Sequence, residues 1–194
     1  RWVKVRTSVM QEKIAIRKKA LVKRKKNYFE VMPHFFSPLV KLFKKKNRNI
    51  IALYYPSNYE VNVLGLFNLI KKTKLRTLLP VINSNNLMNF TEWKQLDPLQ
   101  VNEFGMLEPS LQGKIIVPNF MLVPLLAFDS NNNRLGYGKG FYDKFLNKFL
   151  EIKKNITTIG VAFSFQKYNK LPVSNLDIKL DYILTEKGLK KWKY

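Results

Sequence analysis

The stretch Arg134–Asp143, RLGYGKGFYD, combines residue types and spacing that could do chemistry. Its glycines alternate at positions 136, 138 and 140, and glycine lets a backbone adopt positive φ and approach a ligand closely. Successive N–H groups can then point into one concavity, to which the start of a following helix adds partial positive charge. Lys139 and Arg134 add full charges, so the stretch suits a polyphosphate. Neither the Walker nor the Rossmann glycine pattern is present, so spacing alone leaves an ordinary glycine-rich turn equally open.

Two glutamates lie in short blocks that interrupt regular structure. Glu60 ends the block Tyr55–Glu60, in which Ser57 and Glu60 have the spacing of a capping box. A helix cap and a substrate contact are therefore both open for Glu60. Glu108 lies in the proline-ended loop Phe104–Pro109, where we expect a surface charge rather than a general base or a ligand contact.

Three aspartates are candidate metal ligands. Asp143 lies just inside a predicted helix, where its position favours capping, although it could hold a cation that bridges phosphates. Asp177 and Asp181 are four residues apart in NLDIKLD, and one of them would complete a metal site if it lay near the glycine stretch. His34 is the only histidine, so we expect neither a histidine triad nor a histidine zinc site.

Alternating strand and helix patterns must position these residues. Strands are predicted at Asn49–Tyr55, Arg76–Ile82 (interrupted or ended by Pro80), Ile115–Val117, Met121–Phe128, Thr157–Phe163 and Leu180–Leu184, with Leu87–Trp93 as a hairpin arm. Helices are predicted at Met10–Phe29, in a short basic segment that ends at Lys46, at Val61–Lys71 and at Tyr142–Glu151. Strands separated by helices favour an α/β fold, a single three-layer domain with a mostly parallel central sheet flanked by helices.

The first predicted helix is strongly basic. Ile14, Leu21 and Val22 lie near one another on one helical face, and we expect the lysines and arginines on the other faces to be solvated. The domain is expected to span residues 10–194. Residues 1–9 are expected to be an extension or a misplaced start, since the chain begins with arginine and Met10 could be a natural beginning.

The composition excludes several classes of protein. The chain has no cysteine, which excludes disulfides, thiolate zinc sites and thiol catalysis and fits a reducing cytosol. No apolar run approaches the roughly 20 residues that span a bilayer, and no secretory signal is visible. We therefore expect a cytoplasmic protein without a membrane partner.

The formal net charge of +22 has three interpretations: nucleic-acid binding, anionic substrates, or a lysine- and asparagine-rich composition without a role. A binder of single-stranded nucleic acid would interleave aromatic residues with lysines on an open face. The aromatic residues here fall mostly in apolar strand and helix positions, so we do not expect a nucleic-acid partner.

Several blocks occur together in a recognisable order. Pro124–Leu146 has the pattern P-x-x-A-F-D…R-L-G-x-G-x-G-[FY]-Y-D-x-x-L, and Lys13-x-x-Ile16-Arg17, followed by Arg24, has the pattern K-x-x-[IL]-R…R. In this pattern and order, the blocks resemble the 5-formyltetrahydrofolate cyclo-ligase family over residues 10–186. The remaining matching blocks are Tyr54–Glu60, Phe104–Pro109, Gly160–Gln166 and Leu171–Asp181. The signature of this family has two tyrosines where this chain has Phe141–Tyr142.

The resemblance implies ATP-dependent conversion of 5-formyltetrahydrofolate to 5,10-methenyltetrahydrofolate, with Mg²⁺ as cofactor and ATP as co-substrate. The folate could carry a polyglutamate tail, and we expect a monomer or weak homodimer. By position, the resemblance implies ATP contacts from Lys13, Arg17, Arg134, Leu135, Gly136, Tyr137, Gly138, Lys139, Gly140, Phe141 and Tyr142. It implies folate contacts from Tyr55, Glu60, Tyr137, Gly138, Lys139, Gly140 and Phe141, and Mg²⁺ ligands at Asp143 and Asp177.

Two further hypotheses stay open at this stage. One is an α/β enzyme of the same layout that acts on sugar phosphates, which would also need a phosphate loop but not the combined signature. The other is a degenerate family member that binds folate without turnover.

Overall fold

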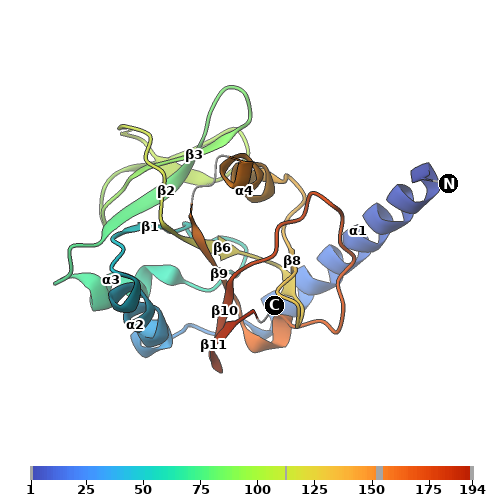
Figure 1. The fold of residues 1–194 in the computed structure, drawn as a ribbon, viewed down its shortest axis with the longest axis horizontal. Helices are drawn as coiled ribbons and strands as arrows, with labels where there is room; N and C mark the ends of the chain where they lie inside the picture. The colour runs from blue at the N-terminus through green and yellow to red at the C-terminus, as the bar shows by residue number, and fades with distance from the viewer. Residues whose placement is uncertain (1, 112, 152–154, 193–194) are drawn as a thin grey trace.

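A seven-stranded sheet organises the computed structural model, which describes residues 2–111, 113–151 and 155–192 (Figure 1). The strand order is β11-β10-β9-β6-β1-β2-β3. The five central strands are parallel, whereas β3 and β11 pair antiparallel at the two edges. The bounds are β1 Ile50–Ala52, β2 Arg76–Ile82, β3 Met88–Glu92, β6 Phe120–Pro124, β9 Thr157–Val161, β10 Tyr182–Thr185 and β11 Gly188–Lys191. The mostly parallel sheet is therefore confirmed.

Helices cover both faces of this sheet, which confirms the three-layer α/β architecture. On one face lie η1 (Pro33–Phe36), α2 (Ser37–Lys46), η2 (Val63–Gly65) and α3 (Leu66–Ile70), and on the other lies α4 (Phe141–Glu151). The apolar residues Phe145, Leu146 and Phe149 recur at helical spacing, so α4 buries them together against the sheet. Burying such side chains contributes about 1.5–3 kcal/mol each. No helix of the described residues is long and apolar enough to span a membrane.

The predicted strand Arg76–Ile82 is confirmed with its bounds, whereas another predicted strand is wrong, and local pairing explains both outcomes. Strand β2 runs through Pro80, because its nitrogen faces the side of β1, which pairs with β2 only as far as Leu78. The predicted strand Ile115–Val117 is wrong: Ile115 makes a single bridge to Thr91. Pro118 follows at once and has no N–H to continue a ladder.

Two short hairpins were not predicted, although the predicted strand Met121–Phe128 covers one arm of the second. One joins β4 (Leu99–Val101) to β5 (Leu107–Pro109), and the other joins β7 (Ala127–Phe128) to β8 (Arg134–Leu135). Each has only two or three paired residues, which is too short for an alternating pattern to be visible. The second hairpin leads directly into the glycine stretch.

Helix α1 spans Trp2–Asn27, so it begins eight residues before the predicted start at Met10. Its N-terminal half extends beyond the body of the molecule (Figure 1). The side that faces the body carries Lys13, Arg17, Ala20 and Arg24, at intervals of three and four residues. The expected apolar face is wrong, because Ile14 and Val22 are more than half exposed. Helix α1 docks through a mainly basic stripe.

The chain order places a topological switch point at the carboxyl ends of the parallel strands, where open α/β sheets have a crevice. From β1 the chain proceeds to β2 on one side, whereas β6, β9 and β10 are added on the other. Ligands of open α/β sheets bind at such a switch point, outside the carboxyl ends of the strands. Here the segments that follow β1 and β6 begin at Leu53 and Leu125, and both carry blocks that the sequence singled out.

Candidate functional site

The glycine loop, residues 136–140, is held between β8 and α4. The preceding turn is closed by Asp129, whose carboxylate accepts hydrogen bonds from the backbone of Asn131, Asn133 and Leu171 and from the Asn133 side chain. These hydrogen bonds enclose the carboxylate and explain why Asp129 is only 1% exposed. A fixed turn sets the direction in which the glycine loop leaves the sheet.

The glycine loop has the backbone geometry that its sequence predicts. Gly138 and Gly140 have φ of +102° and +72°, a region that other residues rarely adopt. A Cβ on Gly138 would lie 3.3 Å from Cζ of Arg17, and one on Gly136 would lie 2.8 Å from Nη1 of Arg134. The glycines therefore let two guanidinium groups lie directly against the loop.

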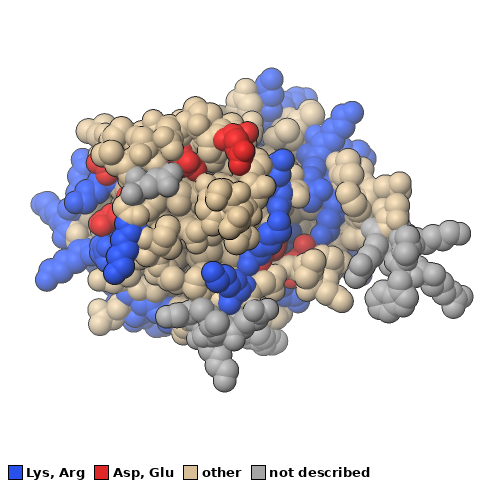
Figure 2. All heavy atoms as spheres, turned by 90° about the horizontal axis from the view of Figure 1, so that it is seen from above, with Lys and Arg blue, Asp and Glu red and all other residues tan. Residues whose placement is uncertain are grey.

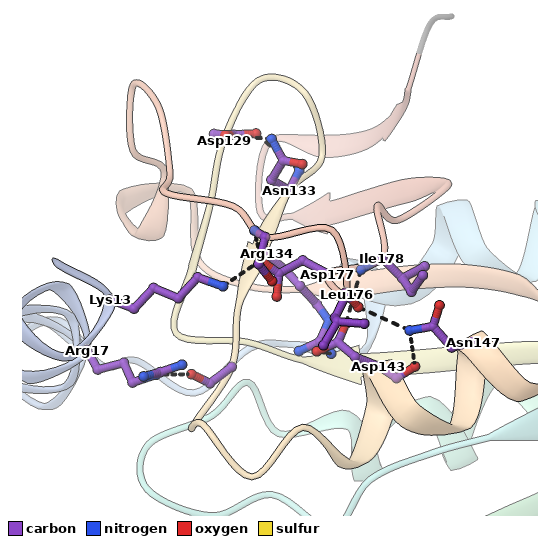
Figure 3. Close-up of polar contacts among 12 residues, drawn as sticks. Lys13, Arg17, Asp129, Asn133, Arg134, Asp143, Asn147, Leu176, Asp177 and Ile178 are labelled. Atoms are coloured by element: carbon purple, nitrogen blue, oxygen red, sulfur yellow. Dashed lines mark hydrogen bonds and ion pairs between the residues drawn. The ribbon is translucent and has the colours of Figure 1, made fainter. Parts of the chain in front are cut away.

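Two cations of α1 contact this loop and the segment before β10. The Nε of Arg17 donates to the carbonyl oxygen of Gly136 at 2.9 Å, across 119 residues of sequence. The Nζ of Lys13 forms an ion pair with Oδ2 of Asp177 at 2.5 Å (Figure 3). The structure thus brings the predicted phosphate contacts Lys13, Arg17 and Arg134 to one place.

The two predicted metal ligands lie on neighbouring segments. Oδ2 of Asp143 pairs with Nη2 of Arg134 at 3.0 Å, and Oδ1 accepts from the backbone N–H of Ile178 at 3.1 Å. Ile178 directly follows Asp177, so the start of α4 with Asp143 lies beside the segment that carries Asp177. We call this place the corner. The described side-chain contacts of Asp143 go to these partners and not to the amides of α4, as capping would require. Asp181 bonds to Thr158 instead and does not join this corner.

The carboxylate pair fits a magnesium ion that is shared with a ligand. Mg²⁺ usually takes one or two carboxylates and completes its octahedral shell with substrate phosphates and water. Among the described residues, no group of three or more histidine, aspartate or glutamate side chains could hold a metal alone. Asp143 and Asp177 are now paired with Arg134 and Lys13, so a bound cation would exchange places with these charges.

Glu60 is buried at the crevice between β1 and β6. Its Oε1 accepts from the Tyr137 hydroxyl at 2.9 Å and its Oε2 from the backbone N–H of Ser57 at 3.0 Å. Burial raises the pKa of Glu60 to about 6, although the Ser57 bond, the charge of Arg24 and the Tyr137 bond all act to lower the pKa. The Ser57–Glu60 spacing closes a turn rather than capping a helix, because the next element, η2, begins only at Val63.

The tip of the β4–β5 hairpin lies against the glycine loop. The rings of Phe104 and Phe141 meet edge to face with centroids 5.3 Å apart, and Nζ of Lys139 lies 5.3 Å from the centre of the Phe104 ring. The expected surface charge at Glu108 is wrong, because this side chain is 4% exposed. It accepts hydrogen bonds from the backbone of Ile82 and from the side chains of Gln100 and Asn102. Glu108 therefore fixes the hairpin that places Phe104.

Comparison with known proteins decides the family. A sequence model described as the 5-formyltetrahydrofolate cyclo-ligase family matches residues 3–186. The chain belongs to the 5-formyltetrahydrofolate cyclo-ligase family. Family membership makes this protein a ligase of the cyclo-ligase type.

Relatives and solved structures agree with this assignment. A 5-formyltetrahydrofolate cyclo-ligase of Haemophilus influenzae is 30% identical over 74% of this chain and 79% of its own. The enzyme of that name from Mycoplasma pneumoniae is 31% identical over 70% and 72%. The solved 5,10-methenyltetrahydrofolate synthetase of Aquifex aeolicus superposes with a TM-score of 0.74 at 31% identity, covering 94% of this chain and 93% of that one.

Not every expected site residue of this cyclo-ligase turns its side chain to the crevice. The ring of Tyr55 packs against Trp93 with centroids 6.2 Å apart. Leu135 is 2% exposed and packs with Ala127 and Leu171, and its carbonyl oxygen accepts from the Leu126 N–H at 2.7 Å. Tyr142 is partly buried, with its ring 5.6 Å from the Arg134 guanidinium, and burial raises the pKa of its hydroxyl.

Sequence reasoning included Arg24 only as part of a motif and grouped it with solvated cations. In the cyclo-ligase structure it is 1% exposed and donates to the carbonyl oxygens of Asn58 and Leu125 and to the Tyr137 hydroxyl. Its helical spacing from Arg17, seven residues or about two turns, places both side chains on one face. That spacing was the available signal.

Proposed function

We propose that this cyclo-ligase uses ATP to convert 5-formyltetrahydrofolate to 5,10-methenyltetrahydrofolate, with release of ADP and phosphate. The formyl oxygen attacks the γ-phosphorus of ATP, so that a C–O–P linkage forms and the bond to ADP breaks. The N10 nitrogen then attacks the activated formyl carbon. The C–N bond forms, the phosphate leaves with the former formyl oxygen, and N10 loses its proton to solvent.

The observation that carries this proposal is the convergence of α1 on the glycine loop. Arg17 donates to the Gly136 carbonyl and lies against Gly138. Lys13 forms an ion pair with Asp177, and Arg134 forms one with Asp143. Phosphoryl transfer depends mainly on positioning and on stabilising charge. Among buried side-chain nitrogens of the described chain, Nε of Arg134 has no hydrogen-bond partner, which leaves a donor beside the loop. These groups support binding of the ATP phosphates.

Magnesium would bind at Asp143 and Asp177 and would neutralise charge on the ATP phosphates. This part of the proposal is supported by the hydrogen bond from the Ile178 N–H to Asp143, because Ile178 directly follows Asp177. Ion pairs with Lys13 and Arg134 hold the two carboxylates in place before the nucleotide arrives. Lys139, exposed at the tip of the loop, is free to turn from the Phe104 ring towards a phosphate.

The folate would bind across the crevice from the phosphates. Glu60 is a buried carboxylate that can accept hydrogen bonds from the N–H groups of a pterin ring. Tyr137 adjoins it, and the Phe104–Phe141 pair offers aromatic surface next to the glycine loop. The formyl group would then lie between Glu60 and the phosphates, close to the loop that both ligands share.

A spectroscopic assay tests the proposal. Purified protein mixed with 5-formyltetrahydrofolate and Mg-ATP should develop the absorbance of methenyltetrahydrofolate, and it should not do so when ATP is left out. Absence of product at high enzyme concentration would overturn the catalytic proposal. Binding of folate under those conditions would then favour a degenerate family member.

Paired aspartate variants test the magnesium site. Asp177→Asn should raise the magnesium concentration needed for half-maximal turnover by about tenfold, because one carboxylate ligand is lost. Asp181→Asn is the matched control from the same segment, since Asp181 bonds to Thr158 away from the corner. We expect it to lower stability without changing the magnesium dependence. Equal magnesium dependence in both variants would remove Asp177 from the proposed site.

A further inference from the structure

We propose that Arg24 is a positioning residue of this enzyme, because its guanidinium group holds the Tyr137 hydroxyl on Glu60 at the switch point between β1 and β6. The inference rests on the proposed function, in which Glu60 and Tyr137 meet the folate. Arg24 itself is 1% exposed and does not face the crevice, so it would act through these two residues rather than on the ligand.

The hydrogen bonds of Arg24 join three segments of the fold. Its Nε and Nη2 donate to the Asn58 carbonyl at 3.0 and 2.6 Å, and Nη1 donates to the Leu125 carbonyl at 3.0 Å. Asn58 follows β1 and Leu125 follows β6, so one side chain links the ends of both strands. Nη2 also donates to the Tyr137 hydroxyl, and Cζ lies 5.5 Å from the centre of that ring.

These donors fix the direction of the Tyr137 hydroxyl. A guanidinium group has N–H donors and no acceptor, so the Tyr137 oxygen must accept from Arg24. The single proton of that hydroxyl is then left for Oε1 of Glu60, 2.9 Å away. Without Arg24 the hydroxyl could rotate, and the link between the glycine loop and Glu60 would lose its fixed orientation.

Arg24 also supplies positive charge to an otherwise neutral or anionic cluster. The groups that face Glu60 are Arg24 from α1, Tyr137 from the glycine loop, Tyr142 from α4 and Tyr54 after β1. The three tyrosines are uncharged, since burial raises the pKa of each hydroxyl. Burying a guanidinium group costs desolvation free energy, and apolar side chains could link the same segments without that cost. The buried charge of Arg24 is therefore best explained by its effect on Glu60. Arg24 therefore favours the ionised carboxylate that a pterin would need.

The test compares three variants with the wild type. Arg24→Met removes the donors and the charge, Tyr137→Phe keeps the ring and removes only the hydroxyl, and Arg48→Met is the control. Arg48 likewise bonds to backbone carbonyls, those of Asn119 and Asn155, but at the amino ends of the strands. For each variant, kcat/KM for 5-formyltetrahydrofolate is measured from about pH 5 to pH 8, together with KM for Mg-ATP.

We expect Arg24→Met and Tyr137→Phe to raise the folate KM about tenfold and to move the acid limb of the profile to higher pH. The KM for Mg-ATP should change by less than about twofold. The double variant should lose less than the sum of the single losses, because both act on one hydrogen-bonded chain. Arg24→Lys, which restores the charge, should return the acid limb part of the way. Arg48→Met should leave the limb in place.

The proposal fails if folded Arg24→Met has the acid limb and folate KM of the wild type. If Arg24→Met does not fold, Tyr137→Phe decides the matter, and an unchanged limb in that variant overturns the proposal. If the wild type has no turnover, the proposed reaction fails separately, and the same comparison is made on equilibrium binding of 5-formyltetrahydrofolate. A pH dependence of binding that Arg24→Met shifts would still support the inference, whereas an identical dependence, or no binding by the wild type, would overturn it.

Discussion

At the residue scale, Phe141 keeps an aromatic contact although it has no hydroxyl group. Phe141 stands where the family signature has a tyrosine, and its ring packs edge to face on Phe104. Phe141→Tyr keeps that contact, so we expect kcat to change by less than about threefold. Phe141→Leu loses the aromatic contact, about 1 kcal/mol, and should raise the folate KM about fivefold. Initial rates of methenyltetrahydrofolate formation measure both variants.

A large gain from the tyrosine would contradict this interpretation. If Phe141→Tyr raised kcat more than about tenfold, the hydroxyl would polarise the formyl group or bind the substrate. This chain would then lack a hydrogen-bond donor that contributes to catalysis. A gain of that size with an unchanged folate KM would assign the hydroxyl to the transition state alone.

The buried carboxyl group of Glu60 should make the stability of the protein depend on pH. Its pKa of about 6 in the folded protein exceeds the ordinary value of 4.5, so the folded state binds this proton more tightly than the unfolded chain. The stabilising contribution is complete below about pH 4.5 and is lost as the pH rises through 6. Glu60→Gln cannot ionise. We expect it to increase the free energy of unfolding by about 1–2 kcal/mol at pH 8 and by little at pH 4.5.

Denaturant unfolding at the two pH values measures this difference. The same substitution should weaken folate binding, since a neutral amide replaces the carboxylate that faces the pterin. If the difference in unfolding free energy between Glu60→Gln and the wild type were the same at both pH values, burial would not raise the pKa of Glu60.

At the element scale, what could be predicted was local and what could not was long-range. Alternating glycines, a preceding turn and the helical spacing of Phe145 and Phe149 all act within a few residues, so the glycine loop and α4 could be predicted. The inward face of α1 could not, because apolar spacing placed Ile14 and Val22 inside while carbonyl groups from distant loops selected Arg24. The same limit applied to Glu108, whose partners lie in β2 and in the hairpin itself.

The β4–β5 hairpin offers a prediction at this scale. Glu108→Ala would leave the amides of Ile82, Gln100 and Asn102 without the carboxylate that they share. Hydrogen bonds to a charged group contribute about 1.5–3 kcal/mol, and these three are part-buried, so we expect a loss of about that size in unfolding free energy. The hairpin also carries Phe104, so the folate KM should rise together with the loss of stability. Glu108→Gln, which keeps one acceptor oxygen, should lose about half as much.

Thermal unfolding and folate KM are the measurements for the hairpin variants. The ATP phosphates would be bound from α1 and the glycine loop, so the KM for Mg-ATP should change little. A loss of ATP affinity equal to the loss of folate affinity would instead indicate that the hairpin supports the whole site.

At the scale of the whole molecule, six separated segments build the site: α1, the turn after β1, the hairpin tip, the segment after β6, the glycine loop and the stretch before β10. Only the sheet order brings them together, since β1 and β6 are neighbours with 67 residues between Ala52 and Phe120. Such a site forms only when the domain is folded. Unlike the site residues, the Lys and Arg residues that give the molecule its positive charge are spread along the whole sequence.

The last prediction concerns that charge. Lys and Arg side chains project around a largely uncharged centre on the face in Figure 2, and both proposed substrates are anions. If the field steers them, kcat/KM for Mg-ATP should fall about fivefold as the salt concentration rises from about 20 to 300 mM, while kcat stays constant. Lys18 and Lys19 lie exposed on α1, the helix that supplies Lys13, whereas Lys190 and Lys191 lie exposed on edge strand β11.

Charge reversal at these two pairs separates a local field from a general one. Steering towards the site requires that Lys18→Glu with Lys19→Glu lower kcat/KM at low salt by more than the matched pair on β11. Even at about 20 mM salt, screening limits the reach of each charge to roughly 20 Å. Both variants change the net charge by the same amount, so a difference between them cannot come from the total. Equal effects, or a rate that ignores salt, would leave the excess lysine as composition without a role in catalysis.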